Sequence, residues 1–337
     1  MGRMLLPKAK FVFAYRGNWS YMLNTTEKNT ACLLLMVTVF AGFLVPGLSE
    51  IMAPLGRTSL FLMIILSLVP MGRLDFNQVF SIDKKVWQVV AWQLFVLPSI
   101  ILAIAHLAKL NGSITSLMII TASAGSLFAS PTFAELLQVN KQRALQCMIL
   151  STFLMPLSYF VFFTLVLHSE VKLDLDEFTF RCAIFLGFPF GLFLVYMGFA
   201  RAIPTRSVEF IELNARRLTI LALMIFGLGR VGAARELMYN DFGQFAVYLA
   251  IVSGLGIGMA YLTAIVMFKQ GMNDAVTASI VSGFRNVGLG FVLLSGVTSI
   301  HTDAYVGVSQ IPIFLAPLLL NFLVAGKQSN QSQVAIA

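Results

Sequence analysis

The chain has 337 residues, of which 58% are hydrophobic and only 11% are charged, and its formal net charge is +8. This composition excludes a soluble globular domain and predicts a polytopic membrane protein surrounded by a lipid bilayer. The Lys and Arg residues are spread through the connections between apolar segments, so the positive charge does not indicate a nucleic-acid partner.

Ten apolar segments are expected to cross the membrane as helices, because a span needs about 20 residues. In chain order they are 30–46, 58–70, 87–107, 114–139, 144–167, 181–200, 218–233, 243–268, 276–297 and 304–325. The second and seventh are shorter than a usual span. In the eighth, Gly254 and Gly258 have the spacing of small residues that predicts a close helix crossing.

Placing the N-terminus inside puts most Lys and Arg residues on the cytoplasmic side, which predicts that both termini are cytoplasmic. The expected location is the plasma membrane or an inner membrane. The segments then form two halves of five helices, and an odd number per half forces opposite orientations, as in an inverted repeat. The expected organisation is a cytoplasmic arm (1–29), a first repeat (30–167), an external loop (168–180), a second repeat (181–325) and a cytoplasmic tail (326–337).

Two apolar segments at corresponding positions of the two halves are interrupted by small and polar residues. Residues 123–132 read SAGSLFASPT, and residues 279–290 read SIVSGFRNVGLG. Paired interruptions of this kind indicate broken helices at the binding site of a secondary transporter. The sequence therefore predicts that the fourth and ninth helices are unwound near Ser130 and Arg285 and cross each other.

Arg285 is the first candidate for substrate binding, because an arginine at mid-membrane is costly unless it is paired or hydrated. It either presents a fixed positive charge to an anion, or it is structural and bound by carbonyl groups of the crossing helix. Asn286 beside it can bind a ligand or the broken backbone. Ser130, Thr132 and Ser282 complete the candidate site at the two interruptions.

Two further polar residues lie within apolar segments. Glu135 is either a protonatable coupling group and counter-ion of Arg285, or an interfacial acid in water. Gln93, five residues before Pro98, contacts a ligand or bridges helices. Cys32, Cys147 and Cys182 have no spacing typical of a metal site or disulfide framework, so no cofactor or metal is expected.

The order of four motifs resembles the bile acid:sodium symporter family over nearly all of the chain from about Thr30. These are FLVPGLSEIMAPLGRTSLFLMIILSLVPMGRLDF, WQLFVLP at 92–98, ASP followed by Asn140, and GFRNVGLG at 283–290. The resemblance implies ten helices in an inverted repeat. It also implies a panel of helices 1, 2, 6 and 7 beside a core in which broken helices 4 and 9 cross.

The resemblance carries over only part of the family's sodium site. Gln93 and Ser130 match positions of polar ligands, and Ser282 could offer its carbonyl. The family's remaining ligand positions fall on Val281, Pro131, Ala144, Met148 and Arg285. Without a carboxylate and with a guanidinium nearby, Na⁺ would lack charge compensation.

The expected function is alternating-access transport of a small organic anion, with Na⁺ coupling doubtful and proton-coupled or uncoupled transport open. The alternative is a non-transporting membrane receptor or partner-binding protein that retains the fold. An intramembrane enzyme is not expected, since no His, Cys or Asp pair occupies mid-membrane.

Overall fold

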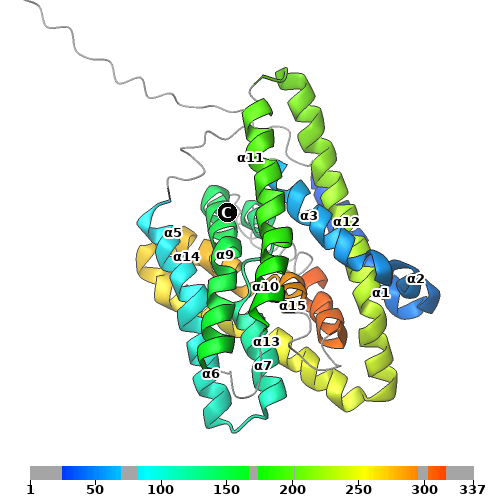
Figure 1. Cartoon of the computed structure of the whole chain (residues 1–337), viewed down its shortest axis with the longest axis vertical. Coiled ribbons are helices and arrows are strands. Elements are labelled where there is room, and N and C mark those ends of the chain that lie inside the picture. Colours follow the sequence, from blue (N-terminus) through cyan, green and yellow to red (C-terminus); the bar gives the residue numbers. More distant parts are fainter. Residues whose placement is uncertain are drawn as a thin grey trace, which may run out of the picture.

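A computed structural model describes residues 25–69, 82–137, 139–166, 174–200, 202–294 and 303–315 (Figure 1). All regular elements in these ranges are helical. Six helical stretches are long and apolar enough to cross a membrane: Pro46–Leu68, Lys84–Leu107, Lys141–Thr164, Leu175–Ala200, Arg206–Asn240 and Phe242–Gln270. Leu33–Leu44 and Gly112–Ser123 are shorter apolar helices. This is the helical content expected of an integral membrane protein.

The first part of the chain contains the first interruption, between α7 (Gly112–Ser123) and α8 (Ser130–Leu136). Its helices are α1 (Thr25–Leu44), α2 (Pro46–Met52), the 3₁₀ turn η1 (Ala53–Leu55), α3 (Gly56–Leu68), α5 (Lys84–Ala91), the π turn η3 (Trp92–Val96), α6 (Leu97–Leu107), α7, α8, α9 (Lys141–Phe160) and the π turn η4 (Val161–Val166).

The second part contains the longest helix and the second interruption. Its helices are α10 (Leu175–Cys182), the π turn η5 (Ala183–Gly187), α11 (Phe188–Ala200), α12 (Thr205–Asn240), α13 (Phe242–Met267), the 3₁₀ turn η6 (Phe268–Gln270), α14 (Met272–Gly283) and α15 (Val287–Leu293). Residues 303–315 are also helical.

Several helix boundaries differ from the expected ones. α10 begins at Leu175, inside the expected external loop 168–180, because Asp174 caps it by accepting from the N–H groups of Asp176 and Glu177, both at 3.1 Å. α12 extends through charged residues on both sides of the expected span 218–233. The apolar pattern marks the stretch suited to lipid, whereas the helix ends at its capping residues.

Both predicted interruptions are present, and they contact each other. The chain leaves helical geometry between Ser123 and Ser130, and again between Gly283 and Val287. Ser126 and Arg285 form an isolated antiparallel bridge. The Leu127 N–H donates to the Phe284 carbonyl and the Asn286 N–H donates to the Gly125 carbonyl, both at 2.9 Å. Each unwound segment therefore satisfies backbone groups of the other, which the hydrocarbon could not do.

The helices pack in two groups, visible on opposite sides of Figure 1. In one group α12 packs against α1, α2 and α3. In the other, α14 packs against α13, α9 and α8, and α15 packs against α7. The crossing interruptions thus belong to the second group.

The close crossing of α13 with α14 uses different glycines from those expected. Nothing lies within 4 Å of a Cβ built on Gly254 or Gly258. A Cβ on Gly283 would instead stand 2.8 Å from the Cβ of Ala260 and 3.0 Å from the carbonyl oxygen of Gly256. The spacing of Gly254 and Gly258 predicts the wrong face of α13 for this crossing. Spacing within one helix does not show which face of the helix packs against a neighbour.

We expect Gly283→Ala to destabilise the protein by about 1–3 kcal/mol, because the new methyl group must push α13 away from the interruption. The control is Gly258→Ala, which places the same methyl group in open space on α13. Thermal unfolding in detergent checks both variants. Equal unfolding temperatures for the two would contradict the close approach.

Candidate functional site

The π turn η3, between α5 and α6, leaves two carbonyl groups without a helical partner. The Leu97 N–H donates to the Trp92 carbonyl, five residues before it. Pro98 follows and has no N–H for the carbonyl of Leu94, four residues before it, or for that of Gln93, five residues before it. The Ser158 hydroxyl donates to the Leu94 carbonyl at 2.5 Å. The Gln93 carbonyl needs a donor from elsewhere.

Arg285 supplies that donor. Its Nη2 donates to the Gln93 carbonyl at 3.0 Å and lies 3.7 Å from the Met259 sulfur. Its Nη1 donates to the carbonyl of Ala124 at 3.0 Å, directly after the end of α7. One guanidinium therefore joins the interruption of α14 and α15 to the interruption of α7 and α8 and to the π turn of η3.

The Arg285 side chain is enclosed by these contacts, with 2% of the residue exposed. Its Nε has no hydrogen-bond partner in the structure. Among the described residues it has no acidic partner, so its two hydrogen-bonded nitrogens are held by carbonyl dipoles. Of the two interpretations of Arg285, these contacts match the one in which carbonyls of the crossing helix bind it.

The Gln93 side chain bridges helices. Its Nε2 lies 3.1 Å and its Oε1 3.3 Å from the Ser126 hydroxyl, in the first interruption. The Ser151 hydroxyl of α9 lies 3.2 Å from the same oxygen and accepts from the Ser126 N–H at 3.0 Å. All three residues are fully buried. Sequence reasoning missed Ser126 and Ser151, although Ser126 lies within the SAGSLFASPT motif that marked the interruption.

The other predicted site residues differ in how their polar atoms are satisfied. The Asn286 Oδ1 caps α15 by accepting from the Leu289 N–H at 3.2 Å, while its Nδ2 has no hydrogen-bond partner among the described residues. The hydroxyls of Ser130 and Ser282 are buried and also have no partner in the structure. The side chains of Thr132 and Glu135 lie outside the described residues, so the counter-ion role of Glu135 stays a prediction.

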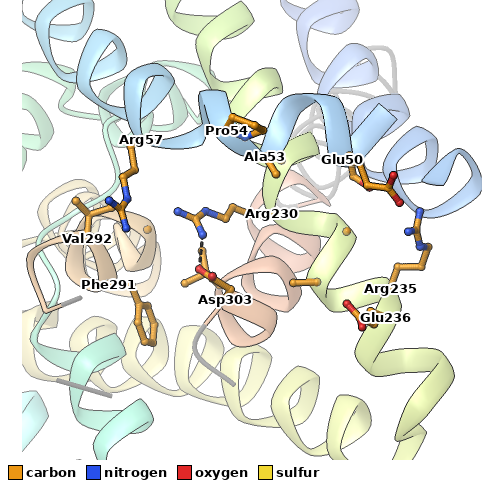
Figure 2. Close-up of a pocket in the computed structure, with 16 residues that line it drawn as sticks. Glu50, Ala53, Pro54, Arg57, Arg230, Arg235, Glu236, Phe291, Val292 and Asp303 are labelled. Carbon is orange, nitrogen blue, oxygen red and sulfur yellow. Dashed lines mark hydrogen bonds and ion pairs between the residues drawn. The ribbon is translucent and has the colours of Figure 1, made fainter. Parts of the chain in front are cut away.

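A cavity of about 630 Å³ lies next to the second interruption, between the two groups of helices (Figure 2). Residues of α2, η1, α3 and α12 form one wall, and Gly288, Phe291 and Val292 of α15 with residues 303 and 306 form the other. The ionisable side chains that line it are Glu50, Arg57, Arg230, Arg235, Glu236 and Asp303. Sequence reasoning did not single out these residues, because their charges resemble those of ordinary helix ends and loops. Arg285, Asn286, Ser130, Ser282 and Gln93 are not part of this lining.

None of the known protein-family models matches the sequence, and no curated protein sequence matches it either.

The positions that differ from the family's sodium ligands carry no side-chain oxygen. Val281 and Ala144 are fully buried, Met148 is 2% exposed, and Pro131 is buried in α8. The Met148 carbonyl already accepts from the hydroxyls of Ser151 and Thr152, at 3.1 and 2.7 Å. These positions do not fit a dehydrated cation that requires several oxygen ligands.

We expect no stabilisation by Na⁺ relative to K⁺ at matched ionic strength, because no carboxylate compensates a cation at these positions. Thermal unfolding in millimolar NaCl and KCl is the measurement. A saturable increase of the unfolding temperature with Na⁺ alone would show that a sodium site exists.

We expect Arg285→Met to lower the free energy of unfolding by about 2–5 kcal/mol, because it leaves the carbonyls of Gln93 and Ala124 buried without donors. Arg285→Lys retains a charge without the fork and should fall between Arg and Met. Arg206→Met, at an exposed position in the first turn of α12, is the control. Unfolding in detergent is the measurement, and parental stability for Arg285→Met would exclude the bridging role.

Proposed function

We propose that this chain is a secondary transporter of a small organic anion that works by alternating access. The observation that best supports this proposal is that the two interrupted helices exchange backbone hydrogen bonds beside a cavity whose lining includes three arginines. Broken helices whose free backbone groups line a site near the membrane midplane are typical of secondary transporters. The proposal includes ten spanning helices in two inverted five-helix repeats with cytoplasmic termini, and its fold resembles that of the bile acid:sodium symporter family.

The proposed motion is a displacement of one helix group against the other. The group around α14 contains both interruptions and the network of Gln93, and would move as the core. The group around α12 would be the panel. The position of the cavity between these groups supports this assignment, because movement of either wall changes access to it.

The proposed substrate is an anion because the cavity presents guanidinium groups, which bind carboxylates and sulfonates through parallel hydrogen bonds. Phe291, Val292 and Val306 provide apolar surface on the wall formed by the core. A compact organic anion matches both parts of the lining. Coupling to protons, or uncoupled transport, fits the buried apolar residues at the sodium-ligand positions better than coupling to Na⁺.

The test is counterflow in proteoliposomes, which detects carrier-mediated exchange without a coupling gradient. Vesicles loaded with unlabelled benzenesulfonate, taurocholate or succinate are diluted into a trace of the same labelled anion. We expect a transient, saturable accumulation for at least one of the three anions, at equal rates in Na⁺ and K⁺ buffers. Empty liposomes are the control.

Binding of an anion without counterflow would contradict transport and favour a receptor with the same fold. Counterflow that requires Na⁺ would keep the transporter and refute the proposed coupling.

A further inference from the structure

The charged side chains of the cavity are unevenly distributed. In Figure 2, Glu50, Arg235 and Glu236 lie at one end, and Arg57, Arg230 and Asp303 lie at the other, close to Val292. The first end has two carboxylates and one guanidinium, whereas the second has two guanidiniums and one carboxylate. The second end, called here the arginine end, therefore carries an excess positive charge.

The two arginines of this end are differently partnered. Arg230 of α12 forms an ion pair with Asp303, and its Nε has no hydrogen-bond partner in the part of the chain that the structure describes. Arg57 of α3 is exposed, and among the described residues it has no hydrogen-bond or ionic partner. Figure 2 shows both guanidiniums directed into the same space. Two like charges that face each other repel, and an anion between them offsets this repulsion by attracting both.

The Arg230 side chain is held in place independently of Asp303. Its guanidinium carbon lies 5.9 Å from the centre of the Phe226 ring, and the side chain is 18% exposed. A Cβ on Gly307 would overlap the Arg230 carbonyl oxygen, so α12 lies directly against the helix that begins at Asp303. Loss of the ion pair therefore leaves Arg230 directed into the cavity.

Asp303 is the more exposed member of the ion pair with Arg230. Its side chain is 68% exposed, so its carboxylate is readily solvated when it leaves Arg230. An exposed ion pair contributes little stability, and a second carboxylate or sulfonate can replace it at small cost. The structure thus contains an arginine whose own acid can be displaced.

We infer that the arginine end binds the anionic group of the transported molecule between Arg57 and Arg230, and that this anion displaces Asp303 from Arg230. The apolar body of the ligand lies against Phe291 and Val292. The ligand class is a carboxylate or sulfonate with a compact aromatic or aliphatic body. The inference depends on the proposed function in that it names the group recognised by the same transporter.

Displacement of Asp303 also changes a contact between the two walls of the cavity. Arg230 belongs to the helix group around α12, whereas Asp303 begins the helix that forms the opposite wall with α15. Their ion pair joins the two walls of the cavity. An anion that takes Arg230 from Asp303 removes this ionic link, while the close packing of α12 against the helix that begins at Asp303 remains.

The experiment measures binding of benzenesulfonate to the purified full-length chain in detergent by ligand-observed NMR, with benzenesulfonamide as the neutral analogue. We expect the sulfonate to bind and the sulfonamide not to bind. Arg57→Gln and Arg230→Gln should each weaken binding by about tenfold, because each removes a charged donor. Asp303→Asn should tighten binding, because it removes the internal competitor. Arg206→Gln, outside the cavity on α12, is the charge-matched control.

Tighter binding by Asp303→Asn together with weaker binding by Arg57→Gln supports the inference. Parental binding by Arg57→Gln, or weaker binding by Asp303→Asn, overturns it. Among the described residues Arg57 has no hydrogen-bond or ionic partner, so its variant stays informative if Arg230→Gln does not fold. Counterflow that persists unchanged in both arginine variants would refute this site and keep the transporter. Sulfonate binding with this mutational pattern but without counterflow would refute transport and keep the site.

Discussion

The structure depends on one guanidinium that belongs to one interruption and donates hydrogen bonds to the other interruption and to the π turn η3. Arg285 leaves helical geometry between α14 and α15, reaches the Ala124 carbonyl after α7, and reaches the Gln93 carbonyl in η3. Carbonyls freed inside a membrane cost several kcal/mol each when they remain unpaired. A planar fork can satisfy two of them at once, which an ammonium group does less well. The charge that makes Arg285 expensive in the membrane also makes these hydrogen bonds strong.

The hydrogen bonds of Arg285 and of the two interruptions hold together the helix group around α14. At the level of Arg285, the backbone exchange between Leu127, Phe284, Gly125 and Asn286 fixes the crossing. At the first turn of α14, Asp274 binds Lys85 at 2.8 Å and also pairs with Arg143, which joins α5 and α9 to the same helix. The core is thus tied at two levels of α14. The boundary with the α12 group contains the cavity, and there the ion pair of Arg230 with Asp303 links the walls.

The sequence predicted the interruptions better than it predicted their contacts. Glycines, serines and a proline inside two apolar segments are visible without a structure, and so is an arginine among them. The partner of Arg285 at Gln93 was not predictable in the same way, because it is a backbone carbonyl freed by a π turn before Pro98. The Gln93 side chain bridges helices by contacting Ser126, which is one of the two roles expected for it. Ser151 carried no signal, since a serine on an apolar helix is common.

The cavity escaped sequence reasoning for a related reason. Arg57 and Arg230 lie more than 170 positions apart, and only the packing of α3 against α12 brings them to one space. Asp303 follows a stretch that is not described and resembles an ordinary loop acid. Charged residues near the ends of apolar segments are common in membrane proteins, so the sequence alone does not place these residues in a shared site.

Arg285 and Arg230 differ in the free energy that each would lose on binding an anion. A ligand that drew Arg285 toward itself would leave the carbonyls of Gln93 and Ala124 unpaired in an apolar interior, a penalty of about 1–3 kcal/mol for each group. A ligand that takes Arg230 releases only Asp303, whose exposed carboxylate is returned to water. The exchange at Arg230 substitutes one anion for another, whereas exchange at Arg285 dismantles the crossover. Arg285 therefore stabilises the framework and contributes a fixed positive charge to it, while the arginine that can change partners lies on the wall of the cavity.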